Sequence, residues 1–205
     1  PFQIYIKPES FYSYQLSQIK PHENIFFQNL NNELICHIIE LISYQIQYTN
    51  HLNVVLDVLQ KKSQNEFSSL AKNFNHSFEN YQKAQMDFAA QAKILLAQPQ
   101  NDQLIQKFIP LLLSQANSFD IFNSYAQIHK KNESLLQKFS NKYSEEASPE
   151  LDGLTIIQVL SSFKQFLQHF VESTQKMISF LDQNDQKLLL QINLAFRALL
   201  DKMNA

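Results

Sequence analysis

The chain contains a single glycine, Gly153, among its 205 residues. Glycine most easily adopts the positive φ angles that tight hairpin turns, bulges and phosphate-binding loops require. A chain almost without glycine is poorly suited to a hairpin-linked sheet, a dinucleotide-binding turn or a P-loop. The sequence therefore predicts an all-α fold of long helices, and we expect a mechanical or adhesive function without enzymatic activity.

Composition supports a helical domain with a substantial core. Hydrophobic residues make up 44% of the chain, and Phe and Tyr recur along its whole length, which argues against disorder. The formal net charge is −2, so the chain has no global attraction to nucleic acid, and we expect no such partner. The one cysteine, Cys36, excludes an intramolecular disulfide and is expected to be a buried, inert thiol.

Residues 1–20 differ in pattern from the rest of the chain. Phe2, Ile4 and Ile6 alternate along it, then come Phe11, Tyr12 and Tyr14, and Pro8 and Pro21 bound this aromatic stretch. The pattern predicts an extended N-terminal arm that packs along helices or inserts into a partner. No basic head followed by an apolar block marks a secretory signal, and the most apolar window, 38–59, carries too many polar residues for a membrane span. We expect a cytoplasmic protein that is at most peripheral to membranes.

From Pro21 onward the apolar residues recur at spacings of three and four, which predicts a single helical domain over residues 21–205. Pro99 marks a break, Pro110 should bend its helix, and residues 144–153 read as a loop. The expected core residues are Phe27, Leu30, Leu34, Ile38, Leu41, Ile42, Leu52, Val55, Leu59, Phe67, Leu70, Phe74, Phe78, Tyr81, Phe88, Ala92, Leu95, Ile105, Phe108, Leu112, Ala116, Phe119, Phe122, Ile128, Leu135, Phe139, Ile157, Leu160, Phe163, Leu167, Phe170, Met177, Leu181, Leu188, Leu189, Ile192, Phe196 and Leu199.

Two places near the end of the first long apolar stripe could interrupt its helix. Ser63 with Glu66 could form a capping box, but no Pro or Gly accompanies it, so we expect the helix to continue. A turn or kink near residue 75 is the alternative, because helix-averse Asn and His residues gather there. The last apolar stripe continues to the C-terminus, which predicts one final helix about 80 Å long at 1.5 Å per residue.

Two segments carry a resemblance to a known family. The C-terminal pattern 157–170, continued by Met177, Leu181 and 189–196, and the pattern 65–74 near the end of the first helix resemble BAR domains of the subgroup found ahead of PH domains. The resemblance implies a crescent-shaped homodimer whose subunits are elongated antiparallel bundles of three long kinked helices, and which senses or shapes membrane curvature in trafficking. It implies helices over about 22–74, 76–143 and 150–203.

The resemblance also implies that basic side chains meet an anionic membrane surface. The residues that fit this role form two groups, namely Lys61 with Lys62 and Lys130, Lys131, Lys138 with Lys142. Each lysine near an anionic bilayer contributes about 1 kcal/mol. The alternative is a solvated helix face, since several carboxylates follow the second group directly in the sequence.

Catalytic and metal-binding patterns are weak. His37 and Glu40 lie three apart on one helix face, but carboxylate bundles that hold two metals use the reverse order, twice. We therefore expect no metal and no cofactor. The alternative to the membrane function is a non-enzymatic scaffold or tether subunit of a larger assembly, which binds partner helices through apolar faces.

Overall fold

The computed structural model describes residues 32–62, 64–97 and 104–204, and it is all-α across them. The N-terminal arm expected at 1–20, the helix start at Pro21 and the break at Pro99 lie outside the described residues. The helices are α3 (Asn32–Lys62), α4 (Ser68–Ala97), α5 (Leu104–Ala116), α6 (Ile121–Ala147), α7 (Ile156–Ser161), α8 (Phe163–Ile178) and α9 (Gln183–Asn204). Short 3-10 helices are η2 (Asn65–Phe67), η3 (Asn117–Asp120) and η4 (Ser148–Leu151).

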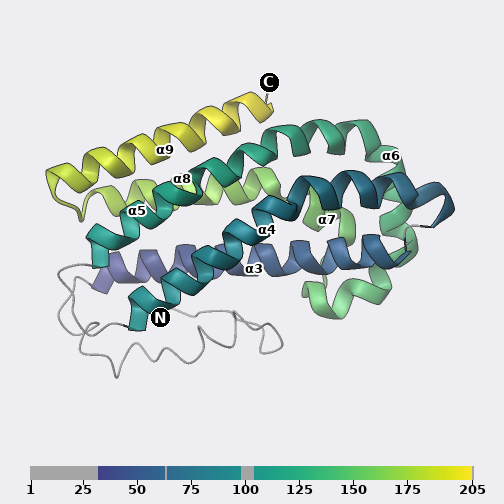
Figure 1. The fold of residues 1–205 in the computed structure, drawn as a ribbon, viewed down its shortest axis with the longest axis horizontal. Helices are drawn as coiled ribbons and strands as arrows, with labels where there is room; N and C mark the ends of the chain where they lie inside the picture. The colour runs from purple at the N-terminus through teal and green to yellow at the C-terminus, as the bar shows by residue number, and fades with distance from the viewer. Residues whose placement is uncertain (1–31, 63, 98–103, 205) are drawn as a thin grey trace.

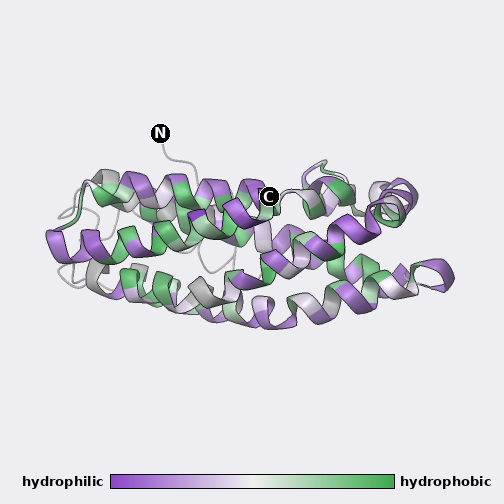
Figure 2. Ribbon diagram, turned by 90° about the horizontal axis from the view of Figure 1, so that it is seen from above, coloured by the Kyte–Doolittle hydropathy of each residue, from purple (hydrophilic) through white to green (hydrophobic). Residues whose placement is uncertain are grey.

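The longer helices run roughly along one axis and pack side by side (Figure 1). Helix α3 packs against α4 and α8, α5 packs against α4 and α9, and α8 lies along α9. The turn between α3 and α4 lies at one end of the molecule, and the turn between α8 and α9 lies at the other (Figure 1). Hydrophobic and hydrophilic residues alternate along each long helix, as the colours in Figure 2 show, which is the pattern of amphipathic helices.

The buried hydrophobic residues form one connected core. Aromatic rings dominate its middle, where Phe119 contacts Phe122, Phe166, Phe170 and Phe196 with ring centroids 5.0–5.8 Å apart. Most of the expected core residues whose side chains the structure describes are buried. Leu188 is an exception, because 39% of it is exposed on the outer side of α9.

The first break lies earlier than expected. Helix α3 ends at Lys62 and α4 begins at Ser68, so the helix boundary expected at 74–76 is corrected to the turn at 64–67. Gln64 is extended, and Asn65 has a φ of 56°, in the left-handed region that Asn tolerates better than most residues. Helix α4 then continues through residue 75 without interruption to Ala97.

The expected second helix, 76–143, is also divided. It comprises most of α4, then α5 and α6, and α4 packs alongside α5 instead of continuing into it. Pro110 lies inside α5, and the helix continues past it to Ala116. Helix α6 extends four residues beyond the expected end at Tyr143, to Ala147.

The expected final helix, 150–203, is corrected to three helices. Helix α7 begins only at Ile156, where the Thr155 hydroxyl accepts a hydrogen bond from the Gln158 amide and the Gln158 side chain accepts one from the Thr155 amide. This capping box replaces the expected start at residue 150, which lies in η4. Ser162 separates α7 from α8.

The largest correction is the reversal between α8 and α9. The Asp182 carboxylate accepts hydrogen bonds from the amides of Asn184 and Asp185 at 3.0 and 2.9 Å, and so caps the first turn of α9. Helix α9 then packs back along α8. The expected helix of about 80 Å is therefore replaced by three shorter ones, of which α8 and α9 lie side by side.

Candidate functional site

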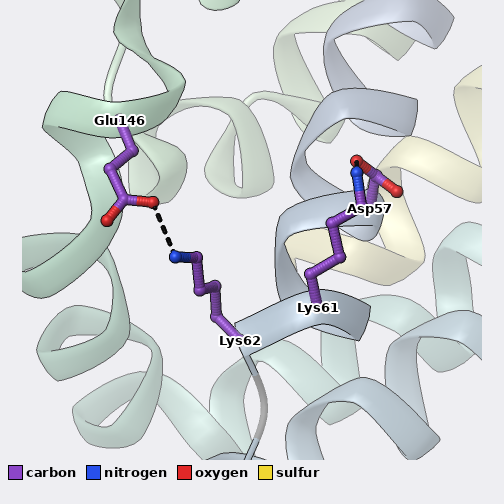
Figure 3. Close-up of polar contacts among 4 residues, drawn as sticks. All are labelled: Asp57, Lys61, Lys62 and Glu146. Carbon is purple, nitrogen blue, oxygen red and sulfur yellow. Dashed lines mark hydrogen bonds and ion pairs between the residues drawn. The ribbon is translucent and has the colours of Figure 1, made fainter.

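Lys61 and Lys62 end helix α3, and both are paired with carboxylates. Lys61 Nζ lies 2.7 Å from Asp57 Oδ2, one turn earlier on the same helix. Lys62 Nζ lies 3.0 Å from Glu146 Oε2 on α6, so this pair joins two helices (Figure 3). The hydrogen bond from Lys61 to Asp57, together with the charge of Asp57, raises the pKa of Lys61.

Lys142 also packs against the protein at this end. Its Nζ lies 5.7 Å from the ring centroid of Phe67 and 5.3 Å from that of Tyr143, and Lys62 Nζ lies 5.7 Å from the Tyr143 ring. Cation–π contacts of this length stabilise exposed sites by about 0.5–1 kcal/mol. The structure therefore brings Lys62 and Lys142 together around one aromatic ring.

The other three lysines extend along α6. Lys130, Lys131 and Lys138 are exposed, and the spacings of seven and four residues place Lys131, Lys138 and Lys142 on one helix face. Helix α6 rises about 1.5 Å per residue, so Lys130 lies about 18 Å from Lys142 along the axis. The six lysines are thus spread over α6 and the end of α3 and do not form a compact cluster. We call this set the lysine strip.

Carboxylates accompany the lysine strip. Those on α3 or α6 within four residues of one of these lysines, together with the one in the adjoining η4, are Asp57, Glu133, Glu145, Glu146 and Glu150. These five acidic residues stand beside six lysines, and two of them form the ion pairs described above. The strip is consequently mixed in sign, which weakens its attraction to an anionic surface.

The pairing of His51 with Asp152 could not be predicted from the sequence. His51 is buried on α3, and its Nε2 lies 2.7 Å from Asp152 Oδ2 in the loop before α7. Asp152 has a φ of 55° and Gly153 a φ of 80°, so the loop turns sharply at this contact. The sequence hinted at this pairing only through the position of His51 within the apolar stripe of α3, where a histidine needs a polar partner.

The other candidates give no reactive arrangement within the described residues. His37 contacts the Phe180 ring with centroids 5.9 Å apart, and no group of three or more potential His, Cys, Asp or Glu ligands is found among the residues described. The side chain of Cys36 lies outside what the structure describes. Burial lowers the pKa of His129 and of His169, which favours their neutral forms.

Two open grooves lie on the surface. One, of about 350 Å³, lies between α3 and α4 and is lined by Asn53, Leu56, Asp57, Gln60, His76, Glu79 and Gln82. The other, of about 540 Å³, lies between α8 and α9 and is lined by Gln168, Val171, Glu172, Gln175, Lys176, Arg197, Leu200 and Asp201. Both mix charges with amide side chains, and neither encloses a buried reactive group.

Comparisons with models of protein families, with curated proteins and with solved structures found no match for this chain. Within the described residues, no helix combines the length and the apolar character needed to cross a membrane.

Proposed function

We propose that this chain is a non-enzymatic scaffold or tether subunit, a helical bundle that binds protein partners through apolar residues on its outer faces. The observation that carries the proposal is the contrast between a single aromatic core and the large apolar residues left outside it. Ile94 on α4 and Leu113 on α5 are 58% and 48% exposed. These two helices pack against each other.

The aromatic core supports a scaffold role, because it fixes the positions of the helices relative to one another. Rings from α4, η3, α6, α8 and α9 contact one another through Phe78, Tyr81, Phe119, Phe122, Phe170 and Phe196. Because close-packed interiors deform little, such a core holds the outer helix faces in a fixed arrangement. A partner that contacts the outer faces of α4 and α5 would therefore meet a preformed surface, and an amphipathic helix is the simplest element to cover it.

The test is to immobilise the purified protein and capture binding partners from a lysate of the cells that produce it. Cross-linking then locates the contact on the chain. We expect a stoichiometric partner that cross-links to α4 or α5 and is lost with the double variant Ile94→Asp, Leu113→Asp. The matched control is the double variant Gln91→Asp, Gln137→Asp, which adds the same two negative charges at exposed polar positions. Retention of the same proteins by the Ile94→Asp, Leu113→Asp variant, or cross-links confined to other helices, contradicts the proposal.

A second candidate function is binding to anionic membranes by a BAR-like homodimer, a protein peripheral to membranes in trafficking. Lys131, Lys138 and Lys142 share the outward face of α6, and this observation favours it. In this form two copies would make a curved body and present both lysine strips to one bilayer. The mixed charge of each strip makes the predicted attraction weak and sensitive to salt.

Vesicle co-sedimentation tests this second function. Wild-type protein should bind vesicles that contain phosphatidylserine at low salt and should not bind vesicles of phosphatidylcholine alone. The double variant Lys131→Glu, Lys138→Glu should lose binding, while Lys72→Glu, Lys83→Glu, an equal charge change on α4, should retain it. Lys142 is left unchanged because it packs on aromatic rings. Equal binding by both double variants would show that the lysine strip is not the contact.

A further inference from the structure

The outer face of α9 carries an unusual order of side chains. Lys187, Leu190, Leu194, Ala198 and Asp201 follow one another at spacings of three and four residues, so they form a single line along the helix, here called the α9 ridge. All five are exposed, and Leu190 and Leu194 are 45% and 55% exposed. The ridge points away from the core, because the buried residues of α9 lie on the opposite side of the helix.

The ridge has a centre and two matching halves. Lys187 lies seven residues before Leu194, and Asp201 lies seven residues after it. Leu190 lies four residues before Leu194, and Ala198 lies four residues after it. A positive charge and a large apolar side chain in the first half therefore correspond to a negative charge and a small side chain in the second half.

This order is complementary to itself when two helices run antiparallel. If two copies of α9 cross at Leu194, the two Leu194 side chains meet at the two-fold axis. Each Leu190 then faces the Ala198 of the other copy, and each Lys187 faces the Asp201 of the other copy. Parallel pairing would instead set Lys187 against Lys187 and Asp201 against Asp201, which is repulsive.

We propose that the α9 ridge is an interaction surface whose partner is a second copy of this chain, bound antiparallel about Leu194. Such an isologous contact uses one patch on both subunits, and two-fold pairing is the commonest symmetry of soluble oligomers. The proposal depends on the proposed function only in treating the chain as an interaction module. It concerns α9, whereas the partner surface proposed above concerns α4 and α5, so either can fail alone.

The size of the ridge sets the expected affinity. Two crossing helices bury less surface than the roughly 1,200 Å² at which stable interfaces begin, so the dimer is weak and exchanges rapidly. Dissociation constants in the micromolar range or above correspond to contacts of this kind. Association should therefore appear only in a concentration series.

The experiment is sedimentation equilibrium of the purified chain over such a series. The wild type should shift from monomer to dimer, and Leu194→Asp, which places two carboxylates at the two-fold axis, should weaken the dimer at least about tenfold. The matched control is Leu154→Asp, an exposed leucine in the loop before α7 that belongs to neither proposed surface, which should dimerise like the wild type. Circular dichroism melts confirm that both variants remain folded.

Charge exchange tests the antiparallel register. Lys187→Asp alone and Asp201→Lys alone should each weaken self-association at least about tenfold, because like charges then meet at both ends of the contact. An equimolar mixture of the two variants should associate again, because each end then pairs opposite charges. A wild type that stays monomeric, a Leu194→Asp variant that dimerises unchanged, or a mixture no tighter than its components would overturn the proposal.

Discussion

The side-chain nitrogen of Asn193 on α9 lies 2.8 Å from Thr174 Oγ1 on α8 and 2.8 Å from the Val171 carbonyl oxygen. Its side-chain oxygen accepts a hydrogen bond of 2.8 Å from Arg197 Nε. The nitrogen of this buried amide thus joins the two helices that the sequence had suggested were one, while its oxygen bonds within α9. Sliding α9 along α8 would separate these partners, so Asn193 sets the register of the pair.

Replacing Asn193 tests this role. Asn193→Leu should lower the free energy of unfolding by about 1–3 kcal/mol, because it removes a buried donor from two acceptors on α8. Gln191→Leu, a similar change at an exposed position of α9, should have little effect. Urea denaturation of the two variants makes the comparison, and equal stabilities would mean that the amide contributes nothing to the packing of α9.

The contact between His51 and Asp152 fixes the loop before α7 to the middle of α3. Asp152→Ala should lower the free energy of unfolding by about 1–3 kcal/mol, since the buried imidazole loses this partner. Hydrogen exchange should also accelerate at residues 152–155, which the contact holds in place. Glu145→Ala removes an exposed carboxylate nearby and serves as the control. Unchanged exchange in Asp152→Ala would show that the loop is held by other contacts.

Much of the core could be predicted because burial follows the spacing of apolar residues within a helix. Phe74, Phe122 and Phe170 were expected in the core and are buried. The same spacing does not report where a helix reverses, since the apolar pattern continues across Met177, Leu181 and Leu189 regardless of the turn between them. The capping carboxylate of Asp182 makes that turn, and neither Gly nor Pro marks it.

The candidate site was predictable only in part, for a similar reason. Exposure of Lys61 and Lys138 follows from their places on the polar sides of their helices. The pairing of Lys62 with Glu146 joins residues far apart in the chain, and it depends on how α3 packs beside α6. Sequence periodicity holds no information on that packing, so this ion pair emerged only from the structure, whereas the carboxylates that follow Lys142 were visible in the sequence.

Gly153 has a φ of 80°, and a side chain placed there would meet no neighbouring atom within 4 Å. Any loss on substitution therefore reflects backbone strain alone. Gly153→Ala should lower the free energy of unfolding by about 1–2 kcal/mol, the usual difference for a left-handed residue that carries a Cβ. Gly153→Asn should cost less, because Asn tolerates this region better. Thermal melts that rank Asn below Ala would contradict this account.

The core contains three buried tyrosines, Tyr48, Tyr81 and Tyr125. Their burial predicts how the free energy of unfolding changes at alkaline pH. Burial raises the pKa of each phenol above its ordinary value, and the Tyr125 hydroxyl also donates to the Leu160 carbonyl at 2.5 Å. In the unfolded chain these phenols ionise near pH 10. Their contribution to stability is therefore complete below about pH 10, and it falls as the pH rises further.

A titration followed at once by phenolate absorbance and by circular dichroism checks this expectation. The three buried phenols should ionise only above about pH 10, together with unfolding. Tyr125→Phe should remove one late-ionising group and also lower stability by about 1 kcal/mol through the lost hydrogen bond. Ionisation of all tyrosines near pH 10 with the helical signal intact would show that water reaches this part of the core.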